Sequence, residues 1–296
     1  VTTYRGVIKN HLKPNLGAVR LCDLTTEQVQ KMVRKLVKAK LAPKTIKNIM
    51  TVLNSALEQA VKAQTLQRNP AKYAKIPAVR VKEIHTFTIQ EIADFVDAAQ
   101  DSPYYAPLMC CLFLGLREGE ALGLAWEHVN FENGKVLICQ QLQKEKSKGG
   151  KFYIQEGTKN GQNRVLDVPD FLLEILKDEK QHQLLAHLSA GPAWQNVWGL
   201  CFTDALGQCI NPHTLWINFK RIAASIGLPD ARVHDLRHTN ATLALVNGDD
   251  LKTVQANLGH ATAAFTLQRY VHASEAMKRA SANRMQQFFD DNVKKA

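Results

Sequence analysis

The chain is 296 residues long, 45% hydrophobic and 22% charged, which are ordinary values for a globular protein. No apolar stretch approaches the roughly 20 residues of a membrane helix, and no signal peptide opens the chain, which predicts a cytoplasmic protein without a membrane partner. The six cysteines form no C-x-x-C pair and mostly lie in apolar runs. This pattern favours free thiols over a disulfide framework or a zinc site.

Positive charge is concentrated in the first third of the chain. Residues 1–86 hold 17 Lys and Arg against 4 Asp and Glu, a net charge of +13, whereas residues 87–296 hold 21 against 23, a net charge of −2. A basic module joined to a nearly neutral one favours a polyanionic partner such as nucleic acid. A merely solvated basic face would give the same count.

Residues 1–80 are expected to form a helical unit. Thr25 and Gln28 have the spacing of a capping box, and the residues that follow place their apolar side chains on one helical face. A second helix is predicted from Pro43, which is tolerated in a first turn. Its polar face carries the residues that we expect to contact DNA: Lys44, Lys47, Asn48 and Thr51. Residues 81–86 then read as an exposed linker.

Helical patterns return after the linker. Thr88 can cap a helix that runs to Gln100, and a mostly apolar helix is predicted from Tyr105 to about Leu114. Glycines then recur every four residues. Gly115 is interpreted as a helix stop, and the other two glycines, at 119 and 123, as sites of close helix packing.

Three short strands are predicted over residues 135–143, 151–156 and 164–168. Asn160-Gly161 is a strong hairpin-turn signal between the last two. Later helices are expected to begin near Phe171, Pro212, His234, Leu251 and Ala263, and the last runs towards the C-terminus. The predicted fold class is therefore mainly α with a small antiparallel β-sheet.

The candidate chemical residues are weak signals one by one. His234 and Arg237 are three residues apart and share a helical face, as an unrelated exposed pair would. Tyr270 alone is more typical of an amphipathic surface than of a nucleophile. There is no Walker A sequence and no G-x-G-x-x-G, so the sequence predicts no nucleotide cofactor.

Taken together, these motifs are specific, because their order and spacing resemble the tyrosine recombinase (phage integrase) family. The resemblance is carried by Gly115-Leu116-Arg117-Glu118-Gly119-Glu120, by Lys159, by His234-x-x-Arg237, by Leu258-Gly259-His260 and by Tyr270. It implies a helical core-type DNA-binding domain over 1–80, a linker over 81–86, and a mixed α+β catalytic domain with a C-terminal tail helix over 87–296. It also implies an N-terminal arm-binding domain that is missing from this chain.

In that family Tyr270 would attack a backbone phosphate and form a 3′-phosphotyrosyl bond. A phenol has a pKa of about 10 and needs help at neutral pH, and His234 would take up its proton. Arg117 and Arg237 would hold the non-bridging oxygens, since a guanidinium makes bidentate phosphate contacts. His260 would donate a further hydrogen bond.

Lys159 would protonate the leaving 5′-oxygen, with Lys151 as the competing candidate. Glu120 would orient the arginines or His234 without donating a proton. The resemblance implies neither metal nor ATP, since two guanidiniums stabilise the transition state and the phosphotyrosine conserves the bond energy.

The implied partners are double-stranded DNA at att-type core sites, a homotetramer that passes through a Holliday junction, an excisionase and a DNA-bending protein. The expected location is therefore the cytoplasm, at the nucleoid when DNA is bound. The opening segment from Tyr4 to Gly17 favours a mobile-element or prophage integrase over a chromosome-dimer resolvase. A non-enzymatic helix-turn-helix regulator built on 250–270 is the alternative outside the family, and a type IB topoisomerase is a chemical relative. The tail helix over 273–293 would dock in cis or on a neighbouring protomer.

Overall fold

The computed structural model describes residues 2–78, 85–145, 149–157 and 163–259, and residues 282, 283, 285, 286 and 290. The chain divides into two compact units, Val1–Glu83 and Ile84–Ala296, and each unit has its own hydrophobic core. Most of the predicted linker, 81–86, lies outside the described residues. Where the chain is described, no helix combines the length and the apolar character needed to span a membrane.

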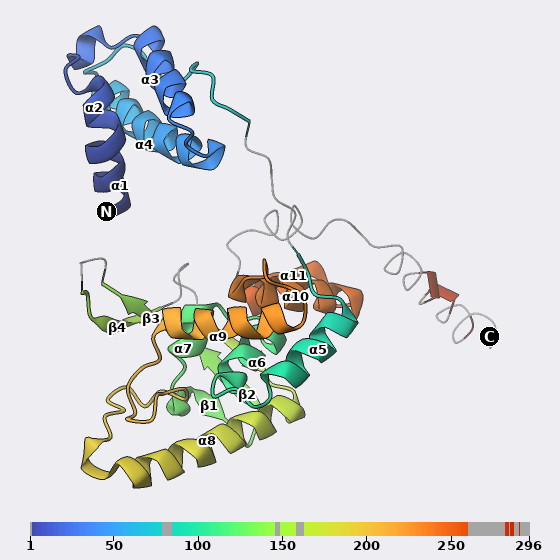
Figure 1. Ribbon diagram of the computed structural model, residues 1–296. Helices are drawn as coiled ribbons and strands as arrows, with labels where there is room; N and C mark the ends of the chain where they lie inside the picture. Colours follow the sequence, from blue (N-terminus) through green and yellow to red (C-terminus); the bar gives the residue numbers. More distant parts are fainter. Residues whose placement is uncertain are drawn as a thin grey trace. The chain divides into compact units, whose positions relative to one another are not determined.

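The first unit is built from helices and helical turns (Figure 1). They are α1 (Thr2–Val7), the π-helical turn η1 (Ile8–Leu12), α2 (Lys13–Leu16), the 3-10 turn η2 (Leu21–Asp23), α3 (Thr26–Lys38) and α4 (Pro43–Lys62). The predicted capping box is present at the start of α3: the Gln28 amide donates to Thr25 Oγ1, and the Thr25 amide donates to Gln28 Oε1. Pro43 occupies the first turn of α4, where it costs no hydrogen bond.

The core of the first unit lies where α3 and α4 pack their apolar faces together. Its buried residues are Val29, Met32, Val33, Leu36, Ile46, Ile49, Met50, Leu53, Leu57 and Ala71. Each fully buried large apolar side chain contributes roughly 1.5–3 kcal/mol relative to its exposed state. The chain after α4 returns to α3, because the Gln30 side chain both accepts from the Lys75 amide at 2.8 Å and donates to its carbonyl at 3.1 Å. These two hydrogen bonds from the Gln30 side chain therefore hold the end of the unit against α3.

The second unit is a larger, mixed body. Its helices are α5 (Ile89–Ala99), α6 (Tyr105–Phe113), α7 (Glu118–Leu122), η3 (Trp126–His128), α8 (Asp170–Ala190), η4 (Gly191–Ala193), α9 (Pro212–Ser225), α10 (Val233–Val246) and α11 (Leu251–Leu258). Its strands are β1 (Val129–Asn130), β2 (Lys135–Ile138), β3 (Gln140–Lys144), β4 (Phe152–Glu156) and β5 (Arg164–Asp167). The fold class predicted from the sequence is confirmed.

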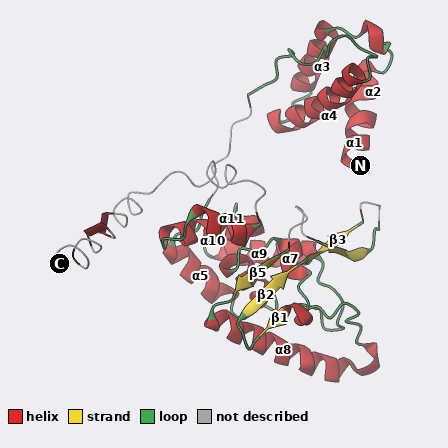
Figure 2. Ribbon diagram, turned by 180° about the vertical axis from the view of Figure 1, so that it is seen from behind, coloured by secondary structure: helices red, strands yellow, loops and turns green. Residues whose placement is uncertain are grey.

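The strands form two antiparallel sheets rather than one (Figure 2). β2 lies between β1 and β5, whereas β3 pairs with β4. The prediction of one strand over 135–143 is wrong, because the chain leaves the first sheet at Cys139. There the Cys139 carbonyl accepts from the Gly157 amide at 2.6 Å, and its sulfur contacts His128 Nε2 at 3.2 Å. The predicted hairpin through Asn160-Gly161 is also wrong, since β5 pairs with β2 and not with β4.

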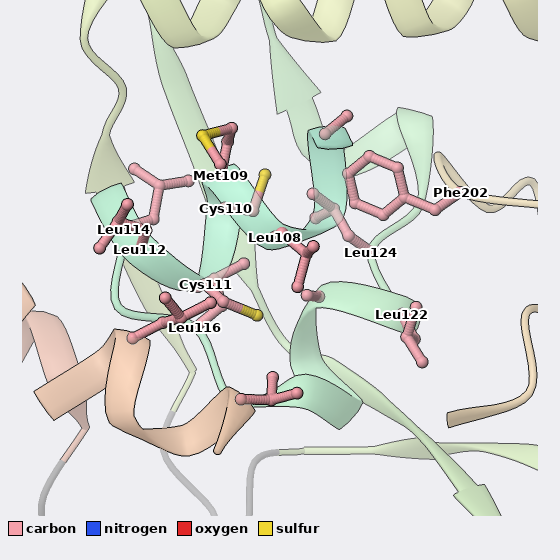
Figure 3. Packing of buried hydrophobic residues seen from close by; sticks show 14 of the residues in the cluster. Leu108, Met109, Cys110, Cys111, Leu112, Leu114, Leu116, Leu122, Leu124 and Phe202 are labelled. Atoms are coloured by element: carbon pink, nitrogen blue, oxygen red, sulfur yellow. The ribbon is translucent and has the colours of Figure 1, made fainter. Parts of the chain in front are cut away.

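The apolar helix α6 lies in the middle of the second unit and contacts α7, α8 and α10. Residues 106–112 of this helix are all buried, and Figure 3 shows several of them converging with Leu122, Leu124 and Phe202. The sequence analysis interpreted Gly123 as a site of close helix packing. In the structure this glycine instead packs against strand β3. A Cβ at this position would lie 2.5 Å from the Leu142 nitrogen of β3. Gly119 likewise faces the Leu142 carbonyl.

The first residues of this unit are fixed on α10. The Phe87 amide donates to Thr239 Oγ1 at 2.9 Å, and that hydroxyl donates to the Asp235 carbonyl one turn earlier, also at 2.9 Å. The Phe87 ring is buried and meets Phe95 of α5 edge-on, with the ring centroids 5.8 Å apart. The chain therefore enters the unit against the helix that carries His234 and Arg237.

Candidate active site

Four of the predicted site residues in the second unit lie in the described part of the chain. Arg117 is the N-cap of α7, Glu120 lies one turn into that helix, and His234 and Arg237 lie in the first turns of α10. The other three predicted residues, Lys159, His260 and Tyr270, lie outside the described residues.

Glu120 is the centre of a buried charge cluster. Its side chain is 1% exposed, and its carboxylate contacts Arg117 Nη1 at 2.5 Å and Arg164 Nη2 at 2.6 Å. Arg237 Nη1 lies 3.8 Å away. Burial alone would raise the pKa of Glu120, but the hydrogen bonds and charges of Arg164 and Arg117 outweigh it and lower the pKa to about 2. Glu120 is therefore ionised at neutral pH.

The same three arginines hold the end of α11. Arg164 Nε donates to the Asn257 carbonyl at 2.7 Å, Arg237 Nη2 donates to the Leu258 carbonyl, and Arg117 Nη2 donates to the Gly259 carbonyl at 3.1 Å. Carbonyls at a helix C-terminus lack helical donors and carry partial negative charge, so cations stabilise them. Three guanidiniums thus position the turn that immediately precedes His260 in the sequence.

Two glycines allow this close packing. Gly259 ends α11 with φ +60°, a left-handed conformation typical of a helix C-terminus. Gly115 has φ +62°, and a Cβ there would lie 2.6 Å from Asn240 Oδ1. The Gly115 carbonyl accepts from Arg237 Nη1 at 2.5 Å. The predicted helix stop at Gly115 is therefore also the point where α10 binds the segment leading to Arg117.

The two predicted phosphate-binding arginines differ in accessibility. The Arg117 side chain is 21% exposed, whereas that of Arg237 is 1% exposed. Three positive guanidiniums around one carboxylate leave a local net charge of +2. Such an excess favours an anionic ligand, and Arg117 is the member of the cluster best placed to meet it.

His234 lies beside the cluster and is accessible to solvent. Its ring meets that of His238 edge-on, with centroids 4.6 Å apart. Partial burial of the ring, together with the charges of Arg237, Arg117 and Arg232, lowers the pKa of His234 to about 4 against the opposing effect of Asp235. The imidazole is therefore neutral at pH 7 and has a nitrogen that can accept a proton, and the lowered pKa makes it a weaker base than an ordinary histidine.

Arg164 was not assigned a role by the sequence analysis. It starts β5, five residues after Lys159, and nothing in the spacing indicates that it meets a carboxylate 44 residues earlier in the chain.

Across the described ranges, no three His, Cys, Asp or Glu side chains are grouped as metal ligands would be.

The predicted DNA-contacting residues of the first unit share one exposed face of α4. Lys44, Lys47, Asn48 and Thr51 are all exposed, opposite the buried face of that helix. A second basic face lies on α3 and was not predicted from the sequence. It is formed by Lys31, Arg34, Lys35 and Lys38, which are exposed at helical spacing.

Comparison with known proteins agrees across both units. The model of the phage integrase family matches residues 82–277, and that of the phage integrase N-terminal SAM-like domain matches residues 1–37. A tyrosine recombinase XerC-like protein of Caldanaerobacter subterraneus subsp. tengcongensis is 30% identical, over 97% of this chain and 77% of that protein. The ICEBs1 integrase of Bacillus subtilis is 24% identical, over 94% of this chain and 75% of its own length.

Solved structures share the fold at lower identity. The Tn1549 transposon integrase in complex with transposon right end DNA matches with a TM-score of 0.82 and 18% identity, over 96% of this chain and 93% of that one. A lambda integrase dimer bound to a COC′ core site matches with a TM-score of 0.62 and 18% identity, over 89% and 88% of the two chains.

Proposed function

The chain belongs to the phage integrase family of tyrosine recombinases, and from that premise we propose that it cuts and rejoins DNA through a covalent bond to Tyr270. Membership makes it a site-specific DNA recombinase and sets aside the helix-turn-helix regulator. The observation that carries the proposed chemistry is the +2 cluster of Arg117, Arg164 and Arg237 around Glu120, with neutral His234 beside it.

In the proposed reaction the Tyr270 oxygen attacks the scissile phosphorus, and His234 takes the phenolic proton. The new bond joins phosphorus to the tyrosine oxygen, the bond to the 5′-oxygen breaks, and Lys159 supplies the proton to that oxygen. Rejoining is the same sequence run backwards with a new 5′-hydroxyl, so no ATP is consumed.

Arg117 donates to the non-bridging oxygens, where negative charge builds in the transition state. Arg237, buried in the same cluster, adds a second positive charge while it donates to the Gly115 and Leu258 carbonyls. His260 follows directly on the turn that the arginines bind, which suits a further donor to the phosphate.

The proposed assembly is a homotetramer on two DNA duplexes at att-type core sites, in the cytoplasm. An excisionase and a DNA-bending protein would set the direction of the reaction. The relatives include phage and prophage integrases, which supports a mobile-element or prophage integrase over a chromosome-dimer resolvase.

A suicide DNA substrate carrying the core site tests the proposal. Wild-type protein should form a covalent DNA adduct that survives denaturation, and Tyr270→Phe should bind the same DNA without forming it. Tyr153→Phe, which changes an exposed tyrosine of β4, is the matched control and should form the adduct normally. An adduct with Phe at position 270 would place the nucleophile elsewhere.

A further inference from the structure

We propose that Arg164 is a positioning residue for strand cleavage, which holds Glu120 and thereby the phosphate-binding guanidinium of Arg117. Its side chain is 8% exposed and its guanidinium donates three hydrogen bonds inside the protein, so it acts through its neighbours and not by touching DNA. This inference rests on the proposed role of Arg117.

Arg164 binds two elements with one planar group. Its Nη2 and Nη1 donate to Glu120 Oε2 at 2.6 Å and Oε1 at 3.3 Å, and its Nε donates to the Asn257 carbonyl at 2.7 Å. A fork that satisfies both carboxylate oxygens fixes the plane of the carboxylate as well as its place. Arg164 therefore ties β5, α7 and the end of α11 to one point.

The orientation of Glu120 decides where Arg117 points. Glu120 Oε1 accepts from Arg117 Nη1 at 2.5 Å, and Oε2 accepts from the Arg117 amide at 3.1 Å. If Arg164 is removed, the carboxylate can rotate towards Arg237, whose Nη1 is 3.8 Å away. Arg117 would then lose one of the two partners that orient its guanidinium, the other being the Gly259 carbonyl. A misplacement of about 1 Å at a reacting centre can cost about 100-fold in rate.

The backbone at Gly259 is built around Arg164. A Cβ on Gly259 would lie 3.2 Å from Arg164 Nη1, tighter than ordinary contact, and the left-handed φ already favours glycine there. The left-handed backbone and the close approach of Arg164 therefore both require glycine at position 259, the residue before His260. This supports a role for Arg164 in setting the path of the chain into the active site, beyond its ion pair with Glu120.

The test compares Arg164→Lys and Arg164→Gln with Lys177→Gln in the full chain. Lysine keeps the charge but cannot reproduce the fork, and glutamine removes the charge. Lys177 forms an ion pair of 2.7 Å with Glu174, nearly the same length as the Arg164 pair, but on an exposed face of α8. Its variant controls for the loss of an ion pair as such and should cleave like wild type.

Each protein is assayed on two suicide substrates, one with a natural scissile phosphate and one with a methylphosphonate there. The methyl group removes the negative charge of one non-bridging oxygen and with it much of the need for a well-placed Arg117. Arg164→Lys should cleave the natural substrate at least about 10-fold more slowly than wild type, and should recover to within about 3-fold on the methylphosphonate.

An equal loss on both substrates, or no loss in a folded variant, overturns the inference. Thermal melting establishes which variants are folded; if Arg164→Gln is not, Arg164→Lys decides, and unfolding of both makes Arg164 a stability residue and also overturns it. Arg117→Lys in parallel separates the two proposals. If it cleaves like wild type, the proposed role of Arg117 fails first, whatever Arg164 does.

Discussion

The two units of this protein carry positive charge in opposite ways. In the first unit, lysines and arginines stand exposed on α3 and α4, and the ion pair between Arg20 and Asp23 is itself open to solvent. In the second, near-neutral unit, arginines are drawn inward onto one carboxylate that is 1% exposed. The first arrangement suits a long polyanion that can be met at many points, and the second suits one phosphate at one place.

The difference has an energetic meaning. Exposed charges are weakened by salt and contribute in small, separable amounts, because water screens them. A buried cluster fails as a whole, since removal of one partner leaves the others desolvated and uncompensated. Substitutions in the first unit should therefore tune binding, whereas substitutions in the second should stop chemistry or destabilise the fold.

The largest effect is expected for Arg117→Lys. A point charge cannot bond Glu120, the Gly259 carbonyl and a phosphate together, so strand cleavage should fall by about 100-fold or more. DNA affinity should stay within about 3-fold, since most of the charge that binds DNA lies elsewhere. Single-turnover cleavage and a mobility-shift titration measure the two quantities. If cleavage and DNA affinity fell by the same factor, the proposed difference between the two units, binding in the first and chemistry in the second, would be wrong.

Glu120→Gln tests the buried cluster as a stability element. It leaves three guanidiniums facing one another, and the free energy of unfolding should fall by about 3 kcal/mol in urea titration. Glu174→Gln, in the exposed pair with Lys177, should cost less than about 1 kcal/mol. Similar costs for the two variants would show that burial does not matter here.

The pH dependence of that stability follows from the direction of the shift. The pKa of Glu120 is lowered from 4.5 to about 2 in the folded protein. Its contribution is therefore complete above about pH 4.5 and is lost as the pH falls towards 2. The difference in unfolding free energy between wild type and Glu120→Gln should shrink over that window.

In the first unit, Lys44→Gln and Lys47→Gln should act separately and modestly. Each lost phosphate contact should reduce the steepness of log K against log salt by about 0.9, while cleavage at saturating DNA is unchanged. Binding titrations of the full chain over a range of salt measure this. Unchanged slopes in both variants would shift the DNA contacts to another face, of which the basic face of α3 is the first to test.

The smallest effect is expected from mild acidification. Because the pKa of His234 is about 4 rather than the ordinary 6.5, lowering the pH from 7 to 5.5 should not protonate it. The acid limb of kcat/KM for cleavage should therefore have its midpoint below pH 5, since this parameter reports the free enzyme. A midpoint near 6.5 would mean that neither the partial burial of this imidazole nor the surrounding arginines lower its pKa.

Local signals in the sequence were enough for most helices and for the motif residues. The capping box predicted at Thr25 and the N-cap predicted at Thr88 marked helix starts correctly, because a cap is decided by residues a few positions apart. The break at Cys139 could not be predicted, since it coincides with a bond from Gly157, which directly follows β4 and lies 18 residues later in the chain. The ion pair between Arg164 and Glu120 could not be predicted for the same reason. It joins β5 to α7, which only the tertiary fold brings together.

The bond between the Phe87 amide and Thr239 has a practical consequence for protein engineering. A chimaera that exchanges the first unit between relatives has to keep Phe87 with its own α10, because the donor and the acceptor lie 152 residues apart within the second unit. A junction before residue 85 preserves the hydrogen bond between Phe87 and Thr239, whereas a junction after Phe87 places a foreign segment against Thr239. Exchanges of the first unit between relatives should therefore be joined before residue 85.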